Sequence, residues 1–298
     1  MEAVKSITTS LPEGIAPTFA ALLPCLQANA SKFPTQYSRL ETHSYGPDPR
    51  QDLDVYHPHN ETPSSPVLLF LFGGGFFMGN KRDPRHPDLL YANFGGFFAE
   101  RGFVTVIANY RLSKGPGNED GNGRYPSGAE DCAGAIEWIS ANLGRDRKVF
   151  LMGNSAGAVH VMTFLFEPSI FKSVTAQIAG AVLLSPPCHQ RRAPESRGPV
   201  NAAYYGSLAD VENNSPIRLL RNGLSRVPML SLVGEFDEGG IIASWADYKA
   251  EYERMGGRID EIWMMGHNHI SPILGLNSTE KEGSRWGEDA VQWMRKLL

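Results

Sequence analysis

The sequence predicts a single α/β domain with a mostly parallel, doubly wound sheet. Apolar runs of strand length alternate along the chain with amphipathic stretches of helix length, which is typical of that architecture. Several of the apolar runs are continuous rather than alternating, as expected of strands that are buried on both faces. The chain has 298 residues, of which 42% are hydrophobic and 20% charged, and this suits one large soluble domain. We therefore expect residues 1–298 to form one domain.

The first half of the chain supplies the start of this sheet. Residues 1–40 are predicted to form an irregular, partly helical N-terminal arm whose apolar residues cover part of a pocket. Alternating residues bounded by turn residues then predict a pair of strands at 42–46 and 53–56. Continuous apolar runs predict strands at 67–72 and 103–110, and an amphipathic stretch predicts a helix over 127–142.

The second half continues the same rhythm. The predicted elements are a strand at 148–154, a helix from 156, a strand at 181–184, a strand at 229–233, a helix at 241–255, a strand at 259–263 and a C-terminal helix from 287. Two segments interrupt the alternation. Residues 115–125 are rich in Gly and Asn and predict a mobile loop at the rim of the domain. Residues 186–226 show no strand of the sheet and predict a small helical cap inserted into the domain.

The stretch from Val149 to Gly157 is the centre of the functional argument. An apolar strand ends in Gly-x-Ser-x-Gly and leads into a helix, which places Ser155 on a sharp turn as a candidate nucleophile. Gly153 and Gly157 permit close packing around that turn. The helix N-terminus directs backbone N–H groups, that of Ala156 first, at an oxyanion formed on an attacked carbonyl. A glycine-rich connection without chemistry is the alternative interpretation of this pattern alone.

A serine hydroxyl needs a base to remove its proton and a third group to orient that base. Two downstream segments offer both kinds of residue. Glu235 and Asp237 follow one predicted strand, and His267 and His269 follow the next. Open α/β sheets place their ligand crevice at the carboxyl ends of their strands, so these side chains are expected near Ser155.

At this point residues 65–298 resemble the α/β-hydrolases of the hormone-sensitive-lipase-like carboxylesterase group, including fungal relatives near the kynurenine formamidases. The resemblance rests on Phe72-Gly73-Gly74-Gly75-Phe76, Asn109-Tyr110-Arg111-Leu112, Arg124-Tyr125-Pro126, Glu130-Asp131, Gly153-Asn154-Ser155-Ala156-Gly157, Gly234-Glu235-Phe236-Asp237 and Gly266-His267-Asn268-His269. It implies an α/β-hydrolase fold with a small cap and a Ser-His-Asp triad. By this resemblance Asp237 is the triad acid and His269 the base, and the N–H groups of Gly74, Gly75 and Ala156 form the oxyanion hole.

Phe72 departs from the pattern of that family, whose oxyanion loop usually reads His-Gly-Gly-Gly. The backbone donors are unaffected by the change, but a phenyl ring cannot supply the hydrogen bonds of an imidazole. We expect Phe72 to brace the loop by apolar packing with Phe70, Phe76 or Phe77.

The resemblance implies a serine hydrolase that cleaves a carboxylic ester with an apolar acyl group or of a small molecule. Alternatives remain open at this stage. Among enzymes they are thioester offloading from a carrier-protein or thioester-bound acyl chain, acyl transfer or carbon-chain tailoring in a secondary-metabolite (polyketide) pathway, and formamide hydrolysis. A non-catalytic protein that binds small molecules on the same fold is the remaining class.

Composition argues against several other functions. The net charge of −4 gives no basic surplus for nucleic acid or an anionic membrane, and no apolar run has transmembrane length. Three scattered cysteines favour a reducing, cytoplasmic compartment. The glycines near residue 75 do not match a nucleotide-binding loop, and His267 with His269 offers two metal ligands without a third. We expect no cofactor and no metal, and a homodimer remains open. His57-Pro58-His59 is interpreted as a solvated turn and His160 as a packed side chain.

Overall fold

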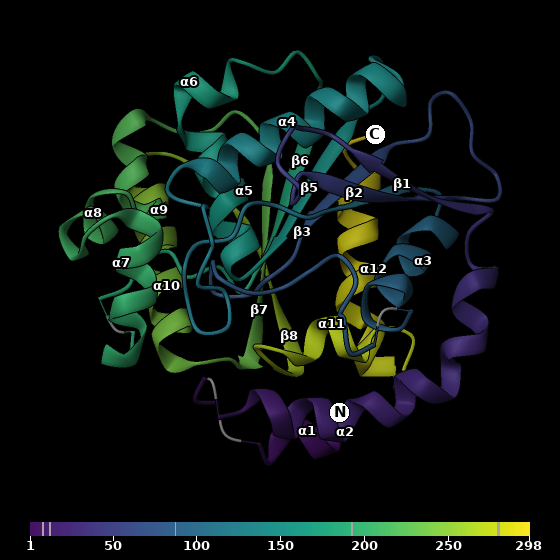
Figure 1. Cartoon of the computed structure of the whole chain (residues 1–298), viewed down its shortest axis with the longest axis horizontal. Helices are drawn as coiled ribbons and strands as arrows, with labels where there is room; N and C mark the ends of the chain where they lie inside the picture. Colours follow the sequence, from purple (N-terminus) through teal and green to yellow (C-terminus); the bar gives the residue numbers. More distant parts are fainter. Residues whose placement is uncertain (8, 12, 87, 192, 279–280) are drawn as a thin grey trace.

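The computed structural model describes residues 1–298 apart from 8, 12, 87, 192 and 279–280 (Figure 1). Its centre is an 8-stranded sheet with the order β1-β2-β4-β3-β5-β6-β7-β8. The β1–β2 and β2–β4 pairs are antiparallel and all the others are parallel, so the predicted mostly parallel sheet is confirmed. The strands are β1 Arg39–Ser44, β2 Asp52–His57, β3 Val67–Leu71, β4 Val104–Ala108, β5 Val149–Asn154, β6 Ile178–Leu184, β7 Met229–Phe236 and β8 Asp260–Asn268.

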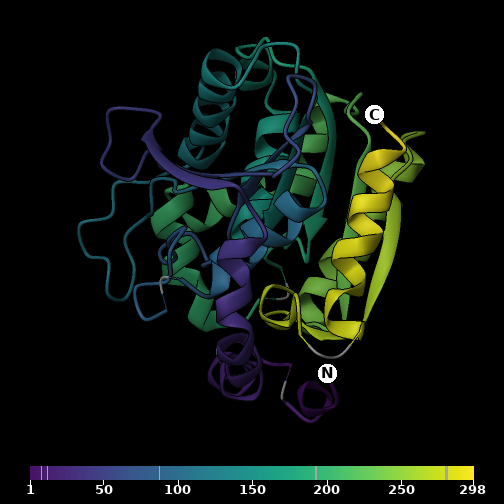
Figure 2. The ribbon, with the colours of Figure 1, turned by 90° about the vertical axis from the view of Figure 1, so that its right-hand side faces the viewer.

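Helices flank this sheet, and Figure 2 shows α12 along its side. The α-helices are α1 Glu2–Lys5, α2 Ile15–Asn29, α3 Leu90–Glu100, α4 Ser127–Asn142, α5 Ala156–Phe166, α6 Pro168–Phe171, α7 Gly198–Tyr205, α8 Leu208–Asn213, α9 Pro216–Leu219, α10 Gly239–Arg254, α11 Ser271–Gly275 and α12 Lys281–Arg295. Short 3-10 helices are η1 Ala30–Thr35, η2 Glu195–Arg197 and η3 Leu220–Asn222. None of the helices in the described parts of the chain is long and apolar enough to cross a membrane.

The central strands form the core. Every residue of β3, β4 and β5 is buried, which explains their continuous apolar runs. Helix α3 packs on this core, and its Phe94 ring stacks on Phe70 with ring centroids 4.0 Å apart. The sequence did not predict α3, because Gly95 and Gly96 interrupt it and glycine disfavours a helix interior. Packing explains the first glycine: a methyl group at Gly95 would lie 2.5 Å from the ring of Tyr56.

The late elements extend beyond their predicted limits. β7 continues to Phe236 and β8 to Asn268, and α12 begins at Lys281 rather than at Gly287. β8 is one of the two edge strands of the sheet, and the side chains of its Trp263 and Met265 are 44% and 56% exposed. An edge strand is covered less completely than a central one and accepts polar residues. β8 therefore extends beyond the apolar stretch from which the sequence predicted it.

The N-terminal arm and the segment between β6 and β7 are both mainly helical. In residues 1–40, α1, α2 and η1 precede β1, and Figure 1 shows α1 and α2 beneath the sheet. Their apolar side chains Leu22, Leu26 and Phe33 are buried in the main core cluster. Between β6 and β7 the described residues form α7, α8 and α9 with η2 and η3 and no strand, while residue 192 of the expected cap lies outside them.

The predicted solvated turn at His57-Pro58-His59 is confirmed at His59, which is exposed in a turn, and is wrong at His57. His57 ends β2, is 1% exposed, and its ring nitrogens lie 2.7 Å from Glu61 and 3.2 Å from Glu41. The Pro that follows suggested a turn, but the strand pairing with β1 continues through His57. A buried imidazole between two carboxylates satisfies its hydrogen-bonding groups within the protein.

Candidate active site

Ser155 lies at the sharp turn between β5 and α5. Its backbone has φ 52° and ψ −116°, an uncommon conformation for a residue with a side chain. The turn requires close contact around it: a methyl group at Gly153 would lie 2.4 Å from the Gly157 carbonyl oxygen, and one at Gly157 would lie 2.0 Å from that of Leu71. Ser155 is partly exposed whereas its neighbours on both sides are buried. The turn therefore presents the hydroxyl to solvent.

Two further side chains complete a hydrogen-bonded chain with this hydroxyl. Nε2 of His269 lies 2.8 Å from Oγ of Ser155, and Nδ1 of His269 lies 2.8 Å from Oδ1 of Asp237. Asp237 directly follows β7 and His269 directly follows β8. With Nδ1 protonated, His269 donates to Asp237 and accepts the hydroxyl proton of Ser155 at Nε2. The three residues selected from the sequence are thus in contact.

The other histidine of the segment points elsewhere. Nδ1 of His267 lies 3.0 Å from Oγ of Ser271, and its Nε2 lies 3.1 Å from the Glu282 carbonyl oxygen. Burial lowers the pKa of His267 to about 4, so this ring is neutral at pH 7. The intervening Asn268 accepts hydrogen bonds from the N–H groups of Ile270 and Ser271 and so fixes the turn that follows β8.

The glycine loop after β3 lies beside Ser155. A methyl group at Gly73 would lie 3.3 Å from Cβ of Ser155. Gly74 and Gly75 have φ values of 146° and 58°, which favour glycine, and in the described chain their N–H groups donate no backbone hydrogen bond. The other orphan donor is the N–H of Ala156, the first residue of α5. The three backbone donors predicted for an oxyanion thus lie on the two segments that meet next to Ser155, the glycine loop and the start of α5.

Phe72 braces this loop by apolar packing, but with partners that we did not predict. Its buried ring stacks on Tyr110 with centroids 4.7 Å apart and lies 5.8 Å from the ring of Tyr91. A methyl group at Gly79 would lie 2.6 Å from the Phe72 ring, so the ring also fixes the far end of the loop. Sequence neighbours such as Phe76 and Phe77 point in other directions because the loop turns between them.

Phe76 instead connects the loop to the segment between β6 and β7. Its ring lies flat on that of Tyr204 in α7, with centroids 4.4 Å and planes 2° apart. Both belong to a small apolar cluster that also contains Ala156 and Val159. His160 lies beneath it, with Nδ1 3.2 Å from the Tyr204 hydroxyl. Burial lowers the pKa of His160 to about 3, which agrees with its interpretation as a packed side chain.

Sequence reasoning missed two charged residues next to this arrangement. Glu238 follows Asp237 and donates its backbone N–H to Oδ1 of that residue at 2.8 Å. Burial raises the pKa of the Glu238 carboxyl, and the charge of Asp237 raises it further. Arg197, from η2, places its guanidinium over Gly75. No local sequence signal marks either residue, because their positions depend on how distant segments meet.

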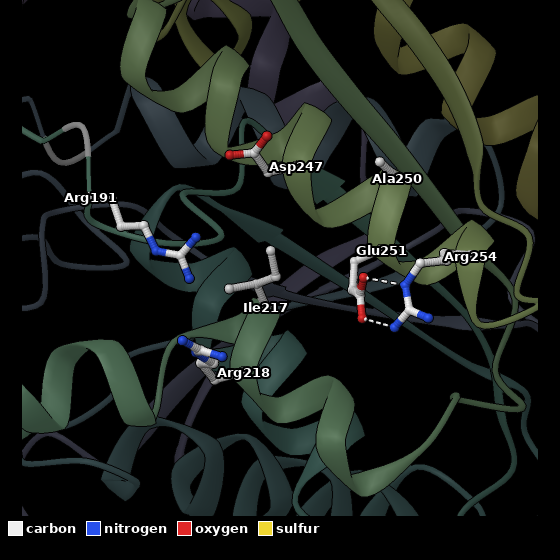
Figure 3. Close-up of a pocket in the computed structure, with 7 residues that line it drawn as sticks. All are labelled: Arg191, Ile217, Arg218, Asp247, Ala250, Glu251 and Arg254. Carbon is white, nitrogen blue, oxygen red and sulfur yellow. Dashed lines mark hydrogen bonds and ion pairs between the residues drawn. The ribbon is translucent and has the colours of Figure 1, made fainter.

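A hollow of about 420 Å³ lies elsewhere, between α9 and α10 (Figure 3). Its lining includes three arginines, and each has a carboxylate partner: Arg191 and Arg218 pair with Glu212, and Arg254 pairs with Glu251. None of the triad residues lines this hollow. Its charges are therefore neutralised locally, and we do not assign the chemistry to it.

Metal coordination has no candidate in the described residues, where no three His, Cys, Asp or Glu side chains form a group suited to an ion. The three cysteines are free thiols, two of them buried.

Comparisons with known proteins find partial sequence similarity to esterases. The family model BD-FAE matches residues 53–165. A probable isoprenylcysteine α-carbonyl methylesterase of Oryza sativa subsp. japonica is 29% identical over 147 residues, which are 46% of this chain and 31% of that protein. The chlorogenic acid esterase of Aspergillus niger is 30% identical over 170 residues, or 52% of this chain and 32% of that protein. The chain thus spans about a third of the length of these curated relatives.

Solved structures match over almost the whole chain. A putative thioesterase from Silicibacter sp. has a TM-score of 0.72 at 17% identity and covers 97% of both chains. Esterase B from Lactobacillus rhamnosis has a TM-score of 0.70 at 16% identity and covers 94% of this chain and 95% of its own. At such identities the likeness concerns the fold. The protein has the α/β-hydrolase fold, and about half of its length is similar in sequence to carboxylesterases.

Proposed function

We propose that this protein is a serine hydrolase that cleaves carboxylic esters of small molecules through an acyl-enzyme. The observation that carries the proposal is the continuous chain of hydrogen bonds from Ser155 through His269 to Asp237, with both distances 2.8 Å. A base within hydrogen-bond reach of the nucleophile, itself oriented by a carboxylate, is the arrangement that activates a serine at neutral pH. The sequence similarity to a probable methylesterase and to a chlorogenic acid esterase supports the same reaction class.

The reaction follows from this geometry. Ser155 Oγ attacks the ester carbonyl carbon while His269 Nε2 accepts its proton, and Asp237 stabilises the resulting imidazolium. The carbonyl oxygen becomes negatively charged and accepts hydrogen bonds from the N–H groups of Gly74, Gly75 and Ala156. Collapse of the tetrahedral intermediate breaks the bond to the alcohol, which takes the proton from His269. Water then attacks the acyl-enzyme by the same steps in reverse and releases the acid and free Ser155.

The surroundings of Ser155 favour an ester with an apolar part. Ala156 and Val159, on the first turns of α5, belong to an apolar cluster that includes Phe76 and Tyr204. Side chains of this kind stabilise hydrocarbon and aromatic groups by removing them from water. We therefore place the apolar part of the substrate against this cluster.

Ester kinetics on the parent and on Ser155→Ala test the proposal. A panel of para-nitrophenyl esters with short and long acyl chains, supplemented by a thioester and a formamide, is assayed for kcat/KM. We expect ester turnover in the parent, and a loss of about a millionfold in kcat for Ser155→Ala, as removal of the serine causes in subtilisin. Ester turnover that persists in Ser155→Ala would refute the proposal, and faster turnover of the thioester or formamide would reassign the carbonyl group.

Folding of the variant must be verified, because Ser155 lies in an uncommon backbone conformation. The matched control is Ser173→Ala. Ser173 is an exposed residue whose hydroxyl donates to the Ile170 carbonyl, far from the triad in the sequence. The Ser173→Ala variant should retain the turnover of the parent. Ser155→Ala and Ser173→Ala should both unfold as cooperatively as the parent.

A further inference from the structure

Arg197 is a cation beside the proposed oxyanion hole, and no partner for it is found among the residues that the structure describes. A methyl group at Gly75 would lie 2.7 Å from Nη1 and 2.9 Å from Nη2 of Arg197, so the guanidinium covers the Cα of that glycine. Within the described parts of the chain, its side chain forms no hydrogen bond and no ion pair, and no carboxylate lies within 4.0 Å of it. The charge is nevertheless partly buried.

Other arginines that are at least partly buried have acceptors in the described chain. Arg111 pairs with Asp131 and Glu130, and Arg147 pairs with Glu61. A guanidinium offers five donors in a planar fork, and removing it from water without an acceptor costs free energy. Burial lowers the pKa of Arg197, and the charge of Glu238 offsets this in part. The group remains a cation at pH 7 and lacks an anion that would satisfy its donors.

The nucleophile is close enough for one small molecule to contact both groups. A methyl group at Gly73 would lie 3.3 Å from Cβ of Ser155, and Gly73 and Gly75 are two residues apart. Two residues of extended chain span at most about 7 Å. A small molecule with its carbonyl group at Ser155 and a chain of several carbon atoms can therefore place a second group at the guanidinium.

We propose that Arg197 binds a carboxylate of the substrate, so that the preferred substrate is an ester that carries a negative charge close to its scissile carbonyl. The planar fork of arginine matches a carboxylate with two parallel hydrogen bonds. This inference rests on the proposed ester hydrolysis and defines its substrate class. The carboxylate belongs to either the acyl part or the alcohol part, and the experiment separates these two sources.

Two pairs of esters of matched shape provide the measurement. On the acyl side they are mono-para-nitrophenyl adipate, which carries a free carboxylate, and para-nitrophenyl adipamate, in which an uncharged carboxamide replaces that carboxylate. On the alcohol side they are para-acetoxybenzoate and para-acetoxybenzamide. Each pair differs only in carboxylate against carboxamide, so the ratio of the two kcat/KM values isolates recognition of the charge. Ratios are measured for the parent, Arg197→Gln, Arg197→Lys and Arg218→Gln.

We expect the ratio of charged to uncharged ester to fall roughly ten- to a hundredfold in Arg197→Gln for one of the pairs, as loss of a charge-assisted hydrogen bond predicts. The pair that responds identifies the source of the carboxylate. Arg197→Lys should restore the ratio in part, because it keeps the charge without the planar fork. Arg218→Gln removes a cation from α9 and should leave both ratios at the parent value.

Replacement of Glu238 should change the same ratio in the opposite direction. The Glu238 carboxyl is the acidic group whose charge acts on Arg197, and the two do not form an ion pair among the described residues. Glu238→Gln removes this competing negative charge without changing the shape of the side chain. The ratio that falls in Arg197→Gln should therefore rise in Glu238→Gln.

The inference is overturned if both ratios are unchanged in Arg197→Gln, or if all esters lose the same factor, which would mean a structural or oxyanion role. Ser155→Ala separates the proposals, since it should abolish turnover of every ester whatever the role of Arg197. If the parent hydrolyses no ester, the proposed function fails. Calorimetry with adipate then measures the anion site alone, and equal binding by the parent and Arg197→Gln, or none by either, would refute it.

Discussion

Replacement of Phe72 by histidine restores the residue that related oxyanion loops carry, and we expect it to destabilise this protein. The Phe72 ring is fully buried and stacks on Tyr110 at 4.7 Å. An imidazole there would bury a polar ring without a dedicated partner, because the Tyr110 hydroxyl already donates to the Phe72 carbonyl oxygen at 2.8 Å. An unsatisfied buried group costs about 1–3 kcal/mol, and the lost aromatic contact about 0.5–1.5 kcal/mol.

Together these two costs lower the free energy of unfolding by about 1.5–4.5 kcal/mol. In a domain of this size each kcal/mol lowers the melting temperature by about 2 °C, so Phe72→His should melt about 3–9 °C below the parent. Phe72→Leu is the matched control, since it loses the ring contact but buries no polar group, and it should fall between the two. Urea unfolding gives the same ranking through the midpoint, with an unchanged slope.

Ester kinetics complete this test. We expect no increase in kcat/KM for aryl esters in Phe72→His, because the packed Phe72 ring already holds the loop that carries the backbone donors of Gly74 and Gly75. A Phe72→His variant that is as stable as the parent and hydrolyses aryl esters faster would refute the packing argument. It would show that the loop lacks a hydrogen bond that histidine supplies.

The remaining predictions concern the neighbouring elements. His269→Ala should reduce kcat about as strongly as loss of the nucleophile, whereas His267→Ala should leave most of kcat in place, since only His269 contacts the serine; kinetics with the reverse ranking would contradict the geometry. Gly157→Ala should fold poorly or not at all, because its methyl group would lie 2.0 Å from the Leu71 carbonyl oxygen; a melting temperature equal to that of the parent would be incompatible with this contact. Burial lowers the pKa of His160 to about 3 and that of His267 to about 4, against about 6.5 in an unfolded chain. The unfolded state therefore binds more protons below pH 6.5, and the free energy of unfolding should fall as the pH drops from 6.5 toward 4. Urea titrations at several pH values measure this slope, and a stability that rises on acidification would contradict it.

Much of the fold could be predicted because its central strands leave a strong signal. β3, β4 and β5 are buried on both faces, and their continuous apolar runs end within a few residues of the predicted limits. Helix α3 could not be predicted, because Gly95 serves packing against Tyr56 rather than helix formation. Local propensity and tertiary contact conflict there, and the contact decides the structure.

The residues of the candidate site also fall into a group that the sequence predicted and a group that it did not. Ser155, Asp237 and His269 were selected because each follows a strand whose end could be recognised, and parallel strands bring their carboxyl ends together. Arg197 and Tyr204 lie in the segment between β6 and β7, and their contacts with the oxyanion loop depend on how that segment folds back. No periodicity or spacing in the sequence encodes that approach, so these residues became visible only in the structure.

The most direct test of the central claim is the site at which a serine-reactive fluorophosphonate modifies the protein. Mass spectrometry of the digested adduct should place a single phosphonyl group on the peptide that contains Ser155. The rate of labelling should fall steeply in His269→Ala, because the hydroxyl then lacks its base at 2.8 Å. Modification of a different serine, or labelling of Ser155 at the same rate in His269→Ala, would contradict the proposed activation of Ser155 by His269.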